Sequence, residues 1–316
     1  MPALVTASLP CRLAAALLLL AAAGASASEP VEGSRTAPPA PPSAGSLPRW
    51  GGFDGAPARF ARPRGGSVSV RRQDGRAVVL LRRPNGEPFA RADAGARGVE
   101  TVRYYDRAGR LRLVITAVRA LQPRGTLKRE DSRCGTDQRR DAGYRWTEPI
   151  AWRFVAASTP PGLDVARTET ALRSARTEWE LNRNHCGLPD RSAIDFRYRG
   201  RTGTGLGRNG LNTIGFGETD AMGGACVRTI ACTITFTSGP RAIESDTRLD
   251  DDRPWGNVGQ AGRFDAWSIV AHETGHTLGL AHVPSNDNVM ECCARVGERS
   301  DRLLGRGDAT ANNARY

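Results

Sequence analysis

The sequence predicts an α/β domain from about residue 140 to residue 316, with a small β-rich segment in front of it. One observation is a helical pattern: Asp164 is placed as an N-cap, and the apolar side chains after it recur at helical spacing, at Val165, Ala171, Leu172, Ala175 and Trp179. The other is a series of short runs rich in β-branched and aromatic residues around that helix. Hydrophobic residues make up 39% of the chain, which is enough for a core and excludes a wholly disordered protein.

The elements of this domain follow in chain order. Residues 150–156 are predicted to form its first strand, ahead of the helix that Asp164 caps. Further strands are predicted at residues 194–198, 213–216, 233–236 and 242–247. A second helix is predicted from about residue 265 to residue 278, and the remainder is expected to be a loop-rich tail.

The β-rich segment, residues 64–122, contains short β-branched runs at 67–70, 78–81 and 111–118. Turn dipeptides lie between them and predict hairpins: Asp74-Gly75, Asn85-Gly86 and Ala108-Gly109. A segment of this size fits either a small β module or a propeptide packed on the domain, and the sequence leaves both open. A charged linker, residues 123–139, connects it to the domain.

The N-terminus has the features of a signal peptide over residues 1–27. Arg12 precedes an apolar run at 13–23, and Ala25-Ser26-Ala27 has the small-x-small form of a cleavage site. We expect cleavage after Ala27, a Pro/Ala/Gly-rich linker at 28–63, and no membrane insertion afterwards, because the apolar run is too short to span a bilayer. The expected location is therefore extracellular, by bacterial export. Six cysteines remain after cleavage, which favours disulfides.

The charge of the chain argues against a nucleic-acid partner. The formal net charge is +12, but the basic residues are scattered, and only Lys128 among them is a lysine. No block of like charges and no aromatic-rich strand is present to bind a phosphate backbone or stack bases. A nucleic-acid or cell-surface adhesin would rest on charge alone.

Residues 272–282 read HETGHTLGLAH and hold three of the four histidines of the chain. On a helix, His272 and His276 project from the same face one turn apart, so both imidazoles reach a single zinc ion. Glu273 lies beside the first ligand and cannot join the same coordination sphere comfortably, but its carboxylate reaches a bound water, as a general base must.

The third ligand requires the helix to stop. Gly279 provides the break, because glycine adopts the positive φ that reverses the chain and returns His282 to the metal. Three ligands leave one position open, as catalytic zinc sites require. The alternative is a structural site closed by Cys292 or Cys293, which leaves Glu273 without a role; the fourth histidine, His185, is expected to have a surface or capping role.

With these residues the chain closely resembles the metzincin zinc metallopeptidases, and among them the matrixin-like (peptidase family M10-type) catalytic domain, over residues 140–316. Beyond the histidine motif, the resemblance rests on Tyr144-Arg145-Trp146, Phe264-Asp265, Gly307-Asp308 and Met290. It implies a metzincin (zincin) fold: a twisted, mostly parallel five-stranded sheet with an antiparallel edge strand, a zinc-binding helix, and a methionine turn in which Met290 forms an apolar floor under the metal.

The resemblance also implies the activity, a zinc metalloendopeptidase with one catalytic Zn²⁺ and Glu273 as its base. A monomer is expected to bind polypeptide substrates in extended conformation along the edge strand. Val283 follows the third histidine and does not match a particular subfamily, and the chain lacks the histidines of a second zinc site. Calcium is a weaker candidate, at Glu244, Asp246 and residues 250–252.

The cysteines allow two interpretations of Cys134. Arg133-Cys134-Gly135 resembles a cysteine switch, in which a thiolate occupies the open metal position, whereas a disulfide from Cys134 to Cys186 is favoured because secreted cysteines usually pair. Cys226 and Cys232 are placed to close a small loop, and the adjacent Cys292 and Cys293 either bridge each other or take separate partners.

One rival function remains: a catalytically weak, zinc-stabilised extracellular binding module with the same fold. Glu273 argues against it, because this residue is needed for turnover and not for zinc affinity.

Overall fold

The computed structural model describes residues 67–73, 76–95, 98–120, 133–220, 226 and 228–316. The predicted signal peptide, the Pro/Ala/Gly-rich linker, the Asp74-Gly75 turn and most of the charged linker lie outside these residues. Within them, no helix is both long enough and apolar enough to cross a membrane.

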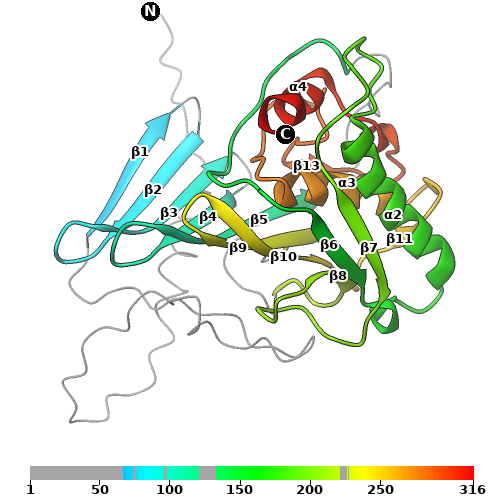
Figure 1. Ribbon diagram of the computed structural model, residues 1–316, viewed down its shortest axis with the longest axis horizontal. Coiled ribbons are helices and arrows are strands. Elements are labelled where there is room, and N and C mark those ends of the chain that lie inside the picture. The colour runs from blue at the N-terminus through cyan, green and yellow to red at the C-terminus, as the bar shows by residue number, and fades with distance from the viewer. Residues whose placement is uncertain (1–66, 74–75, 96–97, 121–132, 221–225, 227) are drawn as a thin grey trace, which may run out of the picture.

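The strands form one mixed sheet that runs across the whole molecule (Figure 1). Its order is β1-β2-β3-β4-β5-β9-β10-β8-β6-β7, and β13 pairs with β5 off this path. A separate two-stranded sheet joins β11 and β12. The bounds are β1 Val68–Gln73, β2 Arg76–Arg82, β3 Pro88–Gly95, β4 Gly98–Tyr105, β5 Leu111–Ala120, β6 Ile150–Phe154, β7 Phe196–Arg201, β8 Asn212–Phe216, β9 Ala231–Ser238, β10 Arg241–Leu249, β11 Trp255–Gly256, β12 Phe264–Asp265 and β13 Cys293–Ala294.

The C-terminal part of the sheet has the mixture of directions that the sequence predicts. β10, β8, β6 and β7 pair in parallel, and β9 pairs antiparallel with β10. Three helices lie over this part of the sheet (Figure 1): α2 (Val165–Leu181), α3 (Ala266–Thr277) and α4 (Arg306–Arg315). Short 3₁₀ turns occur at Ala156–Ser158 and Ser300–Arg302.

The predicted first helix is confirmed as α2. The Asp164 carboxylate accepts a hydrogen bond from the backbone N–H of Arg167 at 2.7 Å, which satisfies one of the unpaired donors at the helix start. The predicted apolar face packs mainly on α3 and touches β7; Val165 is half-buried in it and Trp179 is fully buried. The helix ends at Asn182, whose φ of 52° is left-handed.

The prediction of a loop-rich tail is wrong for residues 306–315, which form α4. Its sequence, RGDATANNAR, has no apolar stripe of large side chains, so hydrophobic periodicity could not reveal it. Asp308 stabilises its start by accepting the backbone N–H of Gly305 at 2.9 Å.

The N-terminal segment is an antiparallel meander of β1 to β5, which confirms the three predicted strands and adds β3 and β4. Its sheet continues into that of the domain, because β5 pairs antiparallel with β9 from Leu113 to Val118. β5 also pairs in parallel with β13, and Arg119 N–H donates to the Cys292 carbonyl at 3.2 Å.

The expectation that the antiparallel strand forms the edge of the sheet is therefore wrong. β9 lies in the interior of the sheet, with β10 on one side and β5 on the other. An open edge leaves a row of N–H and C=O groups unpaired, and β5 pairs with the groups of β9 that would otherwise form such an edge.

Both faces of the β5–β9 pair contribute to cores that the meander and the domain share. Val114 and Val118 pack into the cluster that contains α3, whereas Leu113, Ile115 and Ala117 pack on the other face. This alternation follows from the two-residue period of a strand. The meander and the domain are thus one packed unit in this structure.

Candidate metal centre

The helix α3 holds the first two histidines and begins at a strong N-cap. The Asp265 carboxylate accepts the backbone N–H of Ser268 at 3.0 Å and its hydroxyl at 2.9 Å. Arg302 fixes the other carboxylate oxygen at 2.7 Å. α3 lies between β9 and α2, and Trp179 of α2 donates its indole N–H to the Ala271 carbonyl at 2.7 Å. The helix that carries the motif is therefore held on two sides.

A glycine turn returns the chain to the metal centre, as the sequence predicts. α3 ends at Thr277, and Gly279 has a φ of +89°. The backbone N–H of Leu280 donates to the Gly275 carbonyl at 2.9 Å, which closes the last turn of the helix. Ala281 N–H and the Gly279 carbonyl bond to residues 140 and 142, so the turn is anchored to the segment that precedes β6.

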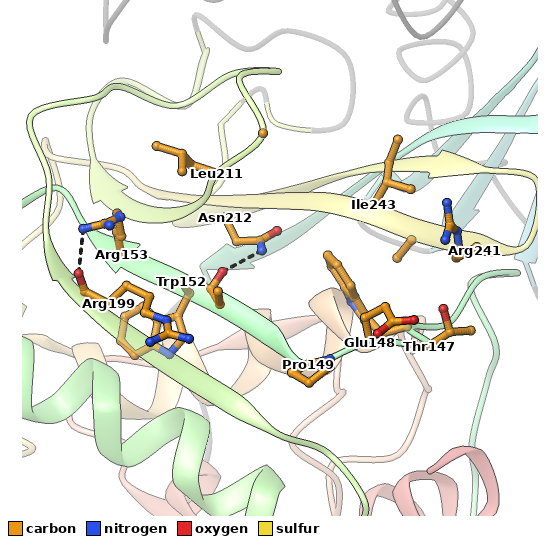
Figure 2. A pocket seen from close by; sticks show the side chains of 14 residues that line it. Thr147, Glu148, Pro149, Trp152, Arg153, Arg199, Leu211, Asn212, Arg241 and Ile243 are labelled. Atoms are coloured by element: carbon orange, nitrogen blue, oxygen red, sulfur yellow. Dashed lines mark hydrogen bonds between the residues drawn. The ribbon is translucent and has the colours of Figure 1, made fainter.

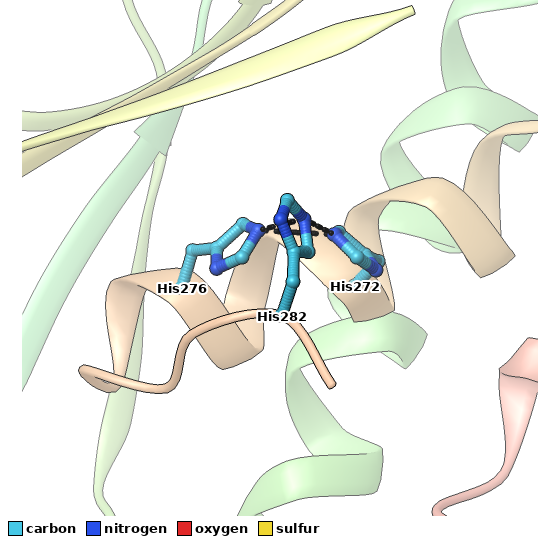
Figure 3. A group of neighbouring side chains, drawn as sticks. All are labelled: His272, His276 and His282. Carbon is cyan, nitrogen blue, oxygen red and sulfur yellow. Dashed lines mark hydrogen bonds between the residues drawn. The ribbon is translucent and has the colours of Figure 1, made fainter. Parts of the chain in front are cut away.

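The three histidines converge on one point (Figure 3). Each pair of Nε2 atoms among His272, His276 and His282 is 3.0 Å apart. Three imidazole nitrogens at such separations fit the ligand set of one zinc ion.

The distal nitrogens fix the tautomers of the first two rings. His272 Nδ1 lies 2.6 Å from the Val289 carbonyl and His276 Nδ1 lies 2.9 Å from the Leu280 carbonyl, so each donates its proton there and leaves Nε2 free to bind a metal. Burial, reinforced by the neighbouring His272, lowers the pKa of His276 well below its usual value. The neutral, ligating form of this ring is therefore favoured.

Glu273 lies beside the triad and is completely buried. One carboxylate oxygen, Oε2, accepts the Thr233 hydroxyl of β9 at 2.5 Å. The other, Oε1, accepts no hydrogen bond from the described residues, which leaves an acceptor available on the residue next to His272. Burial raises the pKa of Glu273 to about 8, and the Thr233 hydrogen bond partly offsets this effect.

The sequence comparison gives the family. A model of the family described as Matrixin matches residues 145–316, which include α2, α3, the histidine triad and α4. The chain belongs to the matrixin family. The triad and the family together identify a matrixin zinc metalloendopeptidase domain, whose histidines suit one catalytic Zn²⁺.

Met290 lies beneath α3 of the matrixin domain. It is buried, and a Cβ added to Gly275 of α3 would overlap its sulfur, so helix and methionine are in close contact. Asp308 holds this turn by accepting the backbone N–H of Val289 at 2.6 Å and of Met290 at 3.3 Å. α4, which the pattern of apolar residues did not reveal, therefore supports the segment that holds Met290.

Two other residues of the site were not identified from the sequence. Thr233 reaches Glu273 only because β9 packs on α3, and one threonine in a β-branched run carries no signal of that contact. Glu100 of β4 places Oε2 3.7 Å from His282 Nδ1, although it belongs to the N-terminal meander, outside the matched residues. Nothing in the local sequence indicates this approach across the sheet.

Cys134 lies away from the triad as a potential ligand, because its sulfur is bonded to Cys186. This disulfide is the alternative that the sequence favours over a cysteine switch. Cys226 and Cys232 also form a disulfide, whereas Cys292 and Cys293 are not disulfide-bonded and their sulfur atoms lie 2.8 Å apart.

The acidic residues proposed for calcium bind backbone groups. Glu244 accepts the N–H groups of Asn209 and Gly210 at 2.7 and 3.0 Å, and Asp246 accepts those of Gly207 and Thr213 at 2.8 and 2.9 Å. Both oxygens of each of these two carboxylates therefore accept hydrogen bonds from the protein backbone.

A hollow of about 410 Å³ lies on the sheet at β6, β8 and β10, and none of the triad residues lines it (Figure 2). Its polar groups include Arg153, which donates to the Arg199 carbonyl at 2.6 Å, and Asn212, which donates to the Ala151 carbonyl at 2.7 Å. The metal centre, in contrast, is closed: His272, His276 and His282 are 3%, 0% and 1% exposed.

Proposed function

We propose that the matrixin domain hydrolyses peptide bonds in extended polypeptides with Glu273 as its general base. The observation that carries this proposal is the convergence of three Nε2 atoms, each pair 3.0 Å apart, beside a buried carboxylate that keeps one oxygen available. His272, His276 and His282 would hold the zinc ion. When bound, zinc supplies a Lewis acid that polarises the scissile carbonyl and acidifies the attacking water.

Glu273 performs the proton transfers. Its carboxylate removes a proton from the water as the water attacks the carbonyl carbon, and then delivers that proton to the departing amine. Thr233 orients the carboxylate through Oε2, which leaves Oε1 for the proton. Met290 supports the helix from below as an apolar floor, and the Gly279 turn keeps the third ligand in place.

We further propose that the substrate takes the place of β5. The backbone groups of β9 between Ala231 and Phe236 pair with β5, so a peptide cannot add to this strand while β5 remains there. This pairing favours the propeptide interpretation of residues 64–122 over the module interpretation. The two disulfides support export, for which we propose the signal peptide at 1–27.

The test follows proteolysis of an unfolded protein substrate by the freshly purified full chain over time, with the state of its N-terminus read in parallel by mass spectrometry. We expect proteolytic activity to appear after a lag, at the time when the chain itself is cleaved between residues 120 and 140. A chelator should abolish this activity. Glu273→Ala is expected to remain inactive and intact. Glu218→Ala, which alters an exposed carboxylate, is the matched control and should behave as wild type.

The outcomes separate the two parts of the proposal. Immediate full activity of an intact chain would support the module interpretation and contradict the propeptide one. Digestion of substrate by Glu273→Ala at the wild-type rate would refute the mechanism. Tight zinc binding without any turnover, before or after cleavage, would favour the catalytically weak binding module.

A further inference from the structure

The N-terminal meander contributes a side chain to the surroundings of the metal site. Glu100 of β4 is 3% exposed, and its Oε2 lies 3.7 Å from Nδ1 of His282, whose side chain is completely buried. This separation is longer than a hydrogen bond, so the carboxylate and the ring interact electrostatically, and burial of both side chains strengthens that attraction. The approach joins two residues that are 182 positions apart in the chain and that belong to different parts of the sheet.

The three histidines differ in what faces their distal nitrogens. His272 and His276 each have a backbone carbonyl within 2.9 Å of Nδ1, supplied by the turns of the matrixin domain itself. His282 instead faces the Glu100 carboxylate. Histidines that bind a metal commonly donate the other ring N–H to a carbonyl or carboxylate, which fixes the ring and increases its basicity as a ligand.

Of the three histidines, His282 is the one whose ring orientation depends most on a contact at the distal nitrogen. Its two companions lie on a helix that is held by α2 and β9, whereas His282 follows the Gly279 turn on an irregular segment. A ring on a loop loses more freedom when it coordinates an ion, so a carboxylate fixed near Nδ1 reduces the cost of binding.

We propose that Glu100 is a positioning residue for the metal centre: its buried carboxylate attracts the Nδ1 side of His282 and holds this ring in the orientation that binds zinc. The inference rests on the proposed zinc site and concerns the chain in which the meander is in place. The N-terminal segment then does more than cover β9, because the full chain holds the ion more tightly than the matrixin domain alone would through its three histidines.

The experiment measures the zinc affinity of the full chain by competition with a chromophoric chelator, for wild type, Glu100→Ala and Glu100→Gln. Loss of a residue that supports a metal ligand typically weakens metal binding by about 10- to 100-fold, and this loss is expected for Glu100→Ala. Glu100→Gln keeps the shape and one acceptor oxygen, so its affinity should lie between the two. The visible absorption of bound Co²⁺ gives a second readout of ligand geometry and should change in Glu100→Ala.

Asp106 provides the matched control. It is also a buried carboxylate of the meander, at the far end of β4, where it binds Arg110 and Arg112. Asp106→Asn should destabilise the fold without changing zinc affinity. Equal losses in Asp106→Asn and Glu100→Ala would overturn the proposal, because the effect would then be general destabilisation. If Glu100→Ala does not fold, two other variants decide. The proposal would be overturned if folded Glu100→Gln kept the wild-type zinc affinity and Co²⁺ spectrum and Glu100→Asp also kept the wild-type affinity.

This test is independent of turnover. A wild-type chain that binds no zinc would refute the proposed function, whereas wild-type zinc affinity in folded Glu100→Ala would refute only the role of Glu100.

Discussion

Replacement of Gly279 by alanine is expected to damage both the fold and the metal site, and a second glycine provides the comparison. Gly279 and Gly162 have nearly the same backbone, with φ of +89° and +84°. Replacing glycine by an L-residue at such an angle lowers the free energy of unfolding by roughly 1–2 kcal/mol at either position. The surroundings differ: a Cβ at Gly162 would have no heavy atom within 4 Å, whereas a Cβ at Gly279 would overlap the carbonyl oxygen of Tyr144.

The magnitude follows from this difference. Overpacking of a buried position typically costs about 1–3 kcal/mol, so Gly279→Ala should lower the free energy of unfolding by about 2–5 kcal/mol and Gly162→Ala by about 1–2 kcal/mol. The overlapping oxygen is backbone and cannot rotate away, so the turn must shift. Because His282 follows the turn by three residues, zinc affinity should also fall in Gly279→Ala and stay unchanged in Gly162→Ala.

The assay combines urea unfolding of the metal-free proteins with zinc titration against a competing chelator. Equal free energies of unfolding for the two variants would refute the packing argument. Wild-type zinc affinity in Gly279→Ala would show that the turn does not position the third ligand.

Two further predictions concern the supports of the site. Cys134→Ala removes a disulfide that spans 52 positions, so the free energy of unfolding should fall by about 4 kcal/mol, while proteolytic activity should begin no earlier than in wild type. Thermal melting checks the stability, and the lag before proteolysis checks the activity. A shortened lag would instead favour the cysteine switch. Burial raises the pKa of Asp308 from 3.8 to about 6, so the folded protein binds this proton more tightly than the unfolded chain does. The stability that protonated Asp308 provides is therefore complete below about pH 4 and is lost as the pH rises through 6, a loss of about 3 kcal/mol. Relative to Asp308→Asn, wild type should weaken over this range in urea unfolding, and parallel pH profiles would contradict the assignment.

The N-terminal meander contributes to both the sheet and the metal-site surroundings of the matrixin domain. The family match begins at residue 145, yet β5 completes the hydrogen bonding of β9 and Glu100 faces a metal ligand. The strand that pairs with β9 and the carboxylate that faces the third histidine thus come from the same segment. Loss of this segment would open β9 and leave His282 without its acidic neighbour.

The sequence by itself determined the parts of this protein that depend on local spacing. The spacing of His272, His276 and His282 with Gly279 between them specifies a helix, a break and a common centre, and the structure brings the three rings together. The capped helix after Asp164 and the strands of the domain follow from local periodicity for the same reason. Such patterns are readable because each element is stabilised mainly by residues within a few turns of one another.

Only the tertiary structure decided which distant segments meet. Because β5 pairs with β9, the strand that was expected at the edge of the sheet lies in its interior. The sequence could not predict this pairing, because both strands show the same β-branched pattern and any of several registers would bury their apolar side chains. Thr233, Glu100 and Asp308 reach the site through contacts between segments separated by 18 to 182 residues. Those contacts are set by how the sheet twists and how helices pack on it, and single polar residues carry no local pattern that encodes this packing.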